Sequence, residues 1–309
     1  MIRRVLVRTL QVPFILLAVY TLTFLLVVGV PGNPFEQGAG RALSPVVEQG
    51  LRQRYGMEDN VRFYLRYLGR AIRGDLGQSL YYDNWTCNEI IAAGLPVSAM
   101  IGLSALLLAV AGGVGLGTLG AVHRGGPADV LALGLSVVGV CVPAFVTGAV
   151  LLVLFSVAIP VLPVGTWGSA TDVLRPAAAL SLVPMAYIAR LTRLGMIEAL
   201  ASDYVRTARA KGLPERTVVL RHALRNALLP VVQYLGPAAA SAMTGSFVVE
   251  RVFNVPGLGV HFVNSVLNRD QMLILATVLV YAALIVFLNL ACDVVSTLLD
   301  PRAATAGAP

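Results

Sequence analysis

The chain has 309 residues, of which 57% are hydrophobic and only 13% are charged, with a mean hydropathy of +0.78 and a net charge of +7. About a quarter of the residues of a soluble domain are charged, so this composition excludes an ordinary soluble protein and indicates a membrane protein. The basic residues border the apolar runs, so the positive charge reflects membrane topology rather than a surface for nucleic acid.

Apolar runs long enough to cross roughly 30 Å of hydrocarbon predict six transmembrane helices in an all-α fold. They lie at about 10–30, 98–121, 130–157, 174–197, 228–249 and 272–293. The first is too long for a signal peptide and no small-residue cleavage site follows it, so we interpret it as a true span. The expected organisation is a tail and first span over 1–30, an external helical subdomain over 31–97, a core over 98–300 with a cytoplasmic loop at 198–228, and a C-terminal tail over 301–309.

Arginine and lysine predict the orientation. Seven of the 23 basic residues lie in 31–97, which is too long for the positive-inside rule. Thirteen of the other 16 lie on one side of the predicted spans, and only Arg175, Arg251 and Arg269 lie on the other. Both termini are therefore expected in the cytoplasm.

The external segment 31–97 contains the stretch NVRFYLRYLGRAIRGDLG. Its apolar residues recur at steps of three and four, with Arg62, Arg66, Arg70 and Arg73 between them, which predicts an amphipathic helix. Such a helix either packs on its own spans or recognises a partner, and the sequence does not choose between these roles.

Small residues recur every four positions in the second run, at Ala109, Gly113, Gly117 and Ala121. This period lets two helix backbones approach closely in a membrane. We therefore expect the second span to be a packing helix.

Prolines interrupt the later runs, at Pro143, Pro184, Pro230 and Pro237. Each removes a backbone donor and opens the helix locally. Kinks are therefore expected in the third, fourth and fifth spans.

Ionisable residues are almost missing from the interiors of the six runs, since Glu250 and Asp293 lie at their ends. A carrier driven by a proton or sodium gradient usually needs a buried carboxylate or cation site near the middle of the membrane. A secondary active carrier is therefore the weaker alternative.

An intramembrane hydrolase is the other alternative. It would need a nucleophile with a base, or a set of metal ligands, at membrane depth. His123, His222 and His261 are the three histidines, and none is paired with cysteine or carboxylates at ligand spacing. We predict no catalytic residue and no metal site.

The loop between the fourth and fifth runs is the most basic internal stretch. The segment DYVRTARAKGLPERTVVLRHALRNALLP carries six arginines and lysines. Ser202 or Asp203 can cap a short helix that Gly212 ends, and a second helix begins near Pro214 and continues to Pro230. A tract that only binds anionic lipid needs charge but no such Gly and Pro pattern.

This segment resembles the cytoplasmic loop of the permease subunits of ABC-type peptide importers, the dipeptide and oligopeptide permease family. GDLGQSL at 74–80, VERVFNVPGLGVHFVNSVLNRD at 249–270 and LLDPR at 298–302 resemble that family's motifs in the same order. The resemblance covers essentially the whole chain and is closest to the first, B-type permease. The loop departs from the broader importer motif, Glu-Ala-Ala followed by Gly, because Arg206, Thr207 and Ala208 precede Gly212.

The resemblance implies a type I ABC importer permease fold and two sets of site residues. The loop would hold a coupling helix that docks on an ATP-binding subunit, through Asp203, Tyr204, Arg206, Thr207, Ala208, Arg209, Lys211 and Gly212. The small Ala208 and Ala210 would seat in a groove of that subunit. The segment NVPGLG and its flanks would form an external gate or a contact with a binding protein, through Glu250, Phe253, Pro256, Gly257 and Gly259.

The motor is expected in another polypeptide. Lys211 is the only lysine and Gly212 follows it, so a Walker A Gly-Lys-Ser/Thr sequence is impossible here. The resemblance implies that ATP and Mg are bound by two partner ATPase subunits, beside a second, C-type permease and an extracytoplasmic binding protein, in a bacterial cytoplasmic membrane. It also leaves the substrate open among dipeptides, oligopeptides, nickel chelates, glutathione and haem.

Overall fold

The computed structural model describes residues 2–35, 44–159, 167–244 and 246–299, so the expected tail 301–309 lies outside the described residues. Its chain divides into two compact units. Three of the boundaries between them fall inside the long helices α1, α4 and α14, and the fourth follows Val255, between α12 and α13. The large unit comprises Met1–Thr9, Ala99–Val255 and Phe287–Pro309, and the small unit comprises Leu10–Ser98 and Pro256–Val286.

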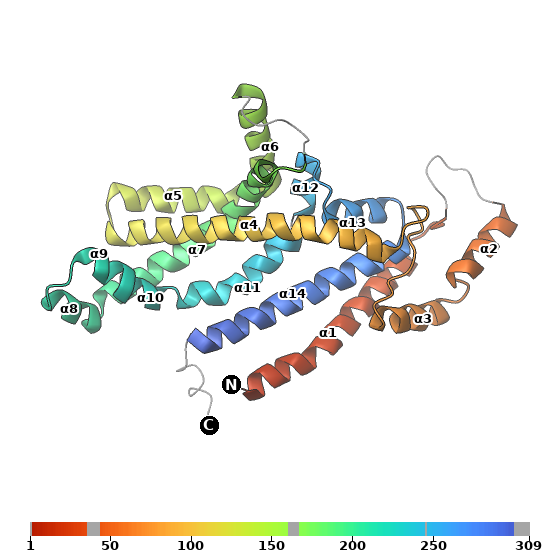
Figure 1. Ribbon diagram of the computed structural model, residues 1–309, viewed down its shortest axis with the longest axis horizontal. Helices are drawn as coiled ribbons and strands as arrows, with labels where there is room; N and C mark the ends of the chain where they lie inside the picture. The colour runs from red at the N-terminus through yellow and green to blue at the C-terminus, as the bar shows by residue number, and fades with distance from the viewer. Residues whose placement is uncertain (1, 36–43, 160–166, 245, 300–309) are drawn as a thin grey trace. The chain divides into compact units, whose positions relative to one another are not determined.

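The regular structure of the described residues is helical, apart from one isolated bridge between Gln78 and Thr86. This confirms the all-α fold class. Two π-helical segments, η1 (Val153–Ala158) and η2 (Val218–Ala223), continue neighbouring α-helices. The α-helices, labelled in Figure 1, are α1 (Ile2–Gly29), α2 (Pro45–Tyr55), α3 (Asn60–Ile72), α4 (Cys87–Val122), α5 (Pro127–Cys141), α6 (Ala144–Leu152), α7 (Ala170–Ala201), α8 (Asp203–Ala210), α9 (Glu215–Thr217), α10 (Leu224–Ala227), α11 (Leu229–Thr244), α12 (Phe247–Phe253), α13 (Leu258–Leu267) and α14 (Gln271–Leu299).

Four helices among the described residues are long and apolar enough to cross a membrane, and the bent pair α5–α6 can count as a fifth. The four lie in α1, α4, α7 and α14, at Arg8–Gly29, Cys87–Val122, Thr171–Ala201 and Gln271–Val295. Helix α11 has 16 residues, which is short of the ~20 that a span needs. The helix expected over 228–249 is divided between α11 and α12.

The kink expected at Pro143 within the run 130–157 is present, and it is sharp. Helices α5 and α6 meet at an angle of 102°. Pro143 has no backbone N–H, and its ring disfavours the helical conformation in the residue before it. Val142 accordingly adopts φ −89° and ψ 119°, which ends α5 and lets the chain turn before α6.

In the large unit, α7 packs against α5, α6, α10 and α11. It also lies against α4 at the predicted small-residue positions. A Cβ atom at Gly113 would lie 2.7 Å from the Ile188 side chain, and one at Gly117 would lie 2.5 Å from the Ala189 carbonyl oxygen. The expected packing role of this stretch is therefore confirmed.

The small unit has an aromatic core in which α3 packs on α1. Tyr20 stacks on Tyr67 with ring centroids 5.9 Å apart, and Phe24 lies 5.3 Å from Phe63. The Tyr20 hydroxyl donates a hydrogen bond to the Tyr64 carbonyl at 2.8 Å. The predicted amphipathic helix is therefore confirmed, with Phe63 and Tyr67 on its buried face.

Asp270 holds the start of α14 in the small unit. Its side chain is fully buried and accepts hydrogen bonds from the Ser79 hydroxyl, the Tyr81 N–H and the Leu273 N–H. The Leu273 bond caps the helix, and the other two tie the loop before α4 to it.

Candidate functional site

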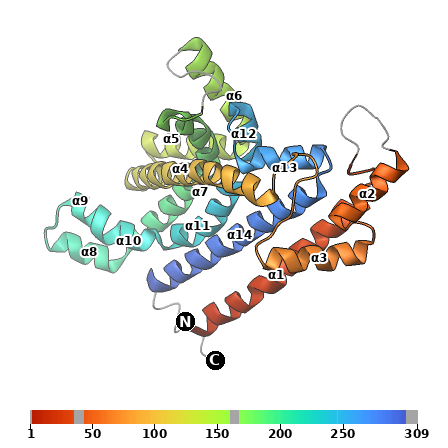
Figure 2. The same cartoon turned by 45° about the vertical axis from the view of Figure 1, so that its right-hand side comes forward.

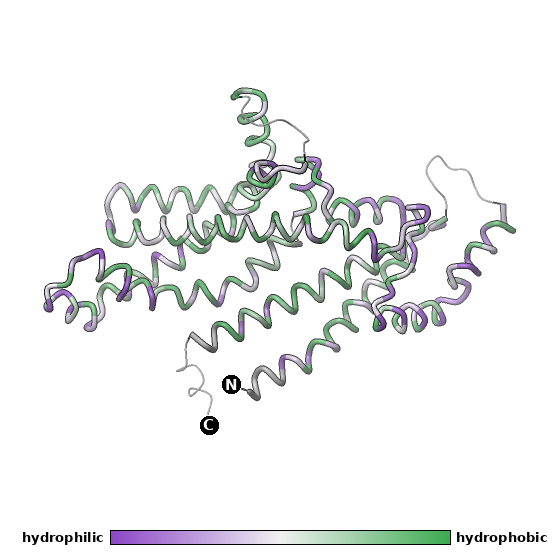
Figure 3. The backbone as a smooth tube through the Cα atoms, in the orientation of Figure 1, coloured by the Kyte–Doolittle hydropathy of each residue, from purple (hydrophilic) through white to green (hydrophobic). Residues whose placement is uncertain are grey.

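The basic loop begins as the sequence predicts, but its second helix ends at Ala227, so Pro230 lies inside α11. Helix α7 ends at Ala201, and Ser202 adopts an extended conformation that redirects the chain into α8. The segment from α8 to α10 lies beside the last turns of α7 in both views (Figures 1 and 2). Its tip is largely hydrophilic, in contrast to α5 (Figure 3).

Gly212 ends α8 in the left-handed conformation, with φ +77°. The Gly212 N–H donates to the Arg209 carbonyl at 2.9 Å, and Pro214 then caps the next helical segment. Nothing lies within 4 Å of a Cβ atom built at Gly212, so the conformation alone favours glycine there. The second helix of the loop contains the π-helical segment η2, which the sequence did not predict.

Helix α8 has one buried face and one exposed face. Val205 and Ala208 are buried, in a cluster with Val218, Val219 and Ala223 of η2. The expectation that Ala208 inserts into a partner's groove therefore does not fit its position, because Ala208 packs on its own loop.

The exposed face is mostly basic and polar. It carries Asp203, Tyr204, Arg206, Thr207, Arg209 and Lys211, and it continues through Gly212. Lys211, Arg216, Arg221 and Arg225 are exposed and form no ion pair within the part of the loop that the structure describes. This face can receive carboxylate and carbonyl oxygens of another protein.

An ion pair joins the two sides of the Gly212 turn. Arg209 donates to the Glu215 carboxylate from Nε at 3.1 Å and from Nη2 at 2.6 Å. The hydrogen bond to Glu215 raises the pKa of the Arg209 guanidinium, and it lowers the pKa of the Glu215 carboxyl group. Both side chains are exposed, so solvent screens the pair, but its bidentate geometry fixes the angle of the turn.

The five residues expected near an external gate divide between the two units. Glu250 and Phe253 are buried in the large unit, where the Ser246 hydroxyl donates to Glu250 at 2.6 Å. The Phe253 ring packs on Gly148, where a Cβ atom would lie 3.2 Å from it. These two residues therefore contribute to packing within their unit rather than to its surface.

Pro256, Gly257 and Gly259 belong to the small unit. Pro256 is exposed, whereas Gly257 and Gly259 are buried. The adjoining Leu258 N–H donates to the Ser98 hydroxyl at 2.9 Å, and a Cβ atom at Gly94 would lie 2.9 Å from the Leu258 nitrogen. The NVPGLG segment is non-helical up to Gly257, but α13 begins at Leu258 and so includes Gly259.

Comparison with known proteins identifies this architecture. Residues 113–305 match the family described as "Binding-protein-dependent transport system inner membrane component". The chain is 40% identical to the dipeptide transport system permease protein DppB of Bacillus subtilis over 93% of both chains. It is also 40% identical to the oligopeptide transport system permease protein OppB of Salmonella typhimurium, over 98% of this chain and 99% of that protein. The chain belongs to this family of permeases.

A solved structure supports the fold. The crystal structure of an amino acid ABC transporter with histidines aligns with 69% of this chain and 94% of its own chain, with a TM-score of 0.50. The sequence identity is 17%, so this likeness concerns the fold alone. The permease is therefore an all-helical membrane protein with the fold of an ABC transporter membrane subunit.

One buried ion pair of the permease was not predicted from the sequence. Arg193 of α7 donates to Asp129 of α5 from Nε at 2.5 Å and from Nη2 at 2.8 Å, and the Gly125 N–H donates to the same carboxylate at 2.9 Å. Asp129 is 3% exposed. Arg193 lies eight residues before α7 ends, so the pair links α5 to the helix that leads into α8.

Proposed function

We propose that this permease is one half of the translocation path of an ATP-driven importer for dipeptides or oligopeptides. The names of the relatives support the substrate class, because DppB and OppB are permeases of dipeptide and oligopeptide transport. Their identity to this chain extends over more than nine tenths of its length. Haem, glutathione and nickel chelates are the alternative cargoes of the same importer type.

The exposed face of α8 is the observation that carries the proposal. It docks on a separate ATPase subunit through Asp203, Tyr204, Arg206, Thr207, Arg209, Lys211 and Gly212. Ala208 supports this surface from below, since it is buried beneath it. ATP and Mg belong to two such subunits, because the chain has no Walker A lysine.

The proposed topology has six spans with both termini in the bacterial cytoplasm. The α5–α6 pair forms the third span, broken at Pro143, and α11 with α12 forms the fifth. The distribution of basic residues supports this orientation, in which the 198–228 loop faces the side where ATPases act. Residues 31–97 then form the external subdomain.

A second, C-type permease completes the path, and an extracytoplasmic binding protein delivers the substrate. Glu250, Phe253, Pro256, Gly257 and Gly259 support the external gate, and Pro256 alone among them is exposed. The burial of four of them suits residues that set the position of a gate, and it is less suited to a surface that grips a binding protein.

Reconstitution tests the proposal directly. The complex that copurifies with this chain is placed in vesicles, and uptake of a labelled dipeptide is measured with ATP and in the absence of any ion gradient. We expect uptake that requires both ATP and the ATPase subunits. Uptake that follows a proton gradient and persists without those subunits would instead establish a secondary carrier.

A further inference from the structure

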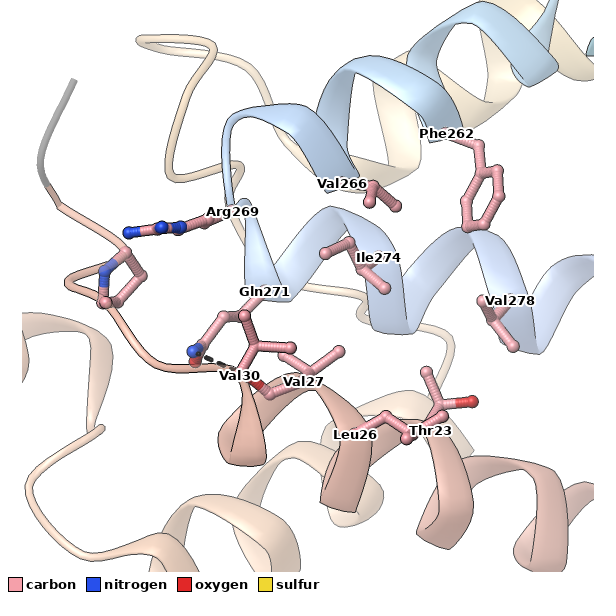
Figure 4. A pocket seen from close by; sticks show the side chains of 12 residues that line it. Thr23, Leu26, Val27, Val30, Phe262, Val266, Arg269, Gln271, Ile274 and Val278 are labelled. Carbon is pink, nitrogen blue, oxygen red and sulfur yellow. Dashed lines mark hydrogen bonds between the residues drawn. The ribbon is translucent and has the colours of Figure 1, made fainter. Parts of the chain in front are cut away.

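The small unit contains an apolar cleft with a volume of about 370 Å³. It lies between α1 and α14, and α13 closes one side of it (Figure 4). Both α1 and α14 are long and apolar enough to span a membrane. The cleft therefore lies between two helices that can span a membrane, and a ligand that enters it must tolerate an apolar environment.

The deeper part of the cleft is apolar. Its wall is made by Leu26 and Val27 of α1, Val266 of α13, and Ile274 and Val278 of α14. Val278 lies seven residues inside α14, which is about 10 Å of helix from the start of that helix. The apolar wall thus extends from the membrane boundary into the hydrocarbon region.

The mouth of the cleft is polar and cationic. Arg269 and Gln271 line it at the point where α1 ends and α14 begins. Arg269 forms no ion pair with a carboxylate in the described part of the chain, and the neighbouring carboxylate of Asp270 is bound to Ser79 and Tyr81.

The backbone holds Arg269 in this place. Arg269 adopts φ +56°, a conformation that is uncommon for residues other than glycine. The following Asp270 N–H donates to the Ser265 carbonyl at 2.8 Å, which closes the end of α13. A Cβ atom at Gly32 would lie 1.8 Å from the Arg269 guanidinium, so glycine at that position leaves the space in which the cation lies.

A second, smaller cavity continues from the mouth. It has a volume of about 190 Å³ and shares Gly32 and Gln271 with the cleft. Arg52 and Asn60 also line it, so its wall offers further hydrogen-bond donors. The combined space is apolar at membrane depth and polar with a positive charge at the boundary.

We propose that the cleft binds one anionic phospholipid, with an acyl chain between α1 and α14 and the phosphate beside Arg269. A peptide would leave its backbone polar groups unsatisfied against the apolar wall. A helix of another permease would fill that wall but would satisfy Arg269 only if it carried a carboxylate at that level. A phospholipid satisfies both parts of the cleft. Its charged phosphate would lie at the polar mouth, and its acyl chain would lie against the apolar wall.

Lipid retention by the assembled complex provides the test. The complex is purified through a tag on this chain, and native mass spectrometry measures its binding of phosphatidylglycerol and of phosphatidylcholine with the same acyl chains. We expect one tightly held phosphatidylglycerol. Arg269→Gln should weaken its binding about tenfold and remove the preference over phosphatidylcholine, because a charged hydrogen bond is lost. Arg73→Gln, the same change on an exposed arginine outside the cleft, should leave binding unchanged.

A second pair of variants tests the apolar wall. Val266→Trp should fill the cleft and reduce the binding of both lipids, whereas Leu267→Trp, on the next and more exposed residue, should not. Equal phosphatidylglycerol retention by Arg269→Gln and Arg73→Gln would overturn the proposal. Crosslinking of a Val266→Cys variant to the second permease in the complex would also overturn it, since a protein helix would then occupy the cleft.

Discussion

Gly117→Ala should destabilise the large unit, whereas Gly115→Ala, two residues earlier in the same helix, should not. The Cβ atom of an alanine at position 117 would lie 2.5 Å from the Ala189 carbonyl oxygen, 2.7 Å from Thr192 Cβ and 3.0 Å from the Arg193 nitrogen. Two of these neighbours are backbone atoms of α7, so they cannot rotate away. At Gly115, by contrast, nothing lies within 4 Å of the added atom.

The size of the effect follows from this geometry. Ordinary van der Waals contact begins at 3.4 Å, so α4 and α7 must separate by roughly 1 Å to accept the methyl group. A gap of that size forfeits a quarter to a half of each dispersion contact nearby, and overpacking of this kind costs about 1–3 kcal/mol. Alanine also favours the helix by about 0.5–1 kcal/mol relative to glycine, which partly offsets the loss at 117 and acts alone at 115.

The two variants should therefore differ in unfolding free energy by about 1–3 kcal/mol, with opposite signs relative to the parent chain. Reversible unfolding of the detergent-solubilised chain by added sodium dodecyl sulphate, followed by circular dichroism, measures the difference. Equal midpoints for the two variants would refute the close contact between α4 and α7. A Gly117→Ala variant more stable than Gly115→Ala would refute it as well.

Three further predictions concern the loop from α8 to α10 and the helices α5 and α7 behind it. Gly212→Pro should abolish substrate-stimulated ATPase activity of the assembled importer without preventing membrane insertion, because proline cannot adopt φ +77°; normal stimulation would contradict the docking role of α8. Asp129→Asn and Arg193→Gln should each uncouple ATP hydrolysis from uptake. The double variant should lose no more uptake than the more defective single variant, and additive losses would mean that the two residues act separately. The pKa of Glu215 is lowered from its ordinary value of 4.5, so its pair with Arg209 contributes fully above that value and is lost as the pH falls through the lowered one. Hydrogen exchange of the Gly212 turn, corrected for the intrinsic rate, should thus rise only once the pH has fallen below the ordinary pKa of a glutamate, and it should already be raised at neutral pH in Glu215→Gln. If neither change alters the exchange of the turn, the pair does not hold it.

The elements that could be predicted from the sequence are those whose pattern lies in neighbouring residues. The end of α8 follows from Gly212 with Pro214, and Ser202 takes the predicted N-cap position, although its hydroxyl bonds back to the Ala199 carbonyl and does not cap α8. The contact of α4 with α7 follows from a four-residue period of small side chains, which has few other structural meanings in a membrane. The amphipathic α3 follows from a period that places Phe63 and Tyr67 on one face.

The features that sequence missed depend on residues far apart in the chain. Asp129 and Arg193 are separated by 64 positions, and each has an ordinary place near the end of an apolar run, where charges are common. The proline at 143 indicated a kink, but its 102° size depends on what α5 and α6 pack against. The inward direction of Ala208 was likewise hidden, because α8 is short and its apolar partners belong to η2.

That inward packing bears on how the loop can transmit work. Val205 and Ala208 of α8 share one hydrophobic cluster with Met196 of α7 and with Ala223 and Ala227 of the following helical segment. A closely packed cluster has low compressibility, so a displacement of α8 is passed to α7 and α10 rather than absorbed within a flexible loop. The Arg193–Asp129 pair lies one turn from Met196, so the same displacement extends to α5. A loop that only attached the chain to lipid headgroups would need its exposed charges but none of this internal packing, and the cluster therefore favours a mechanical role for the segment.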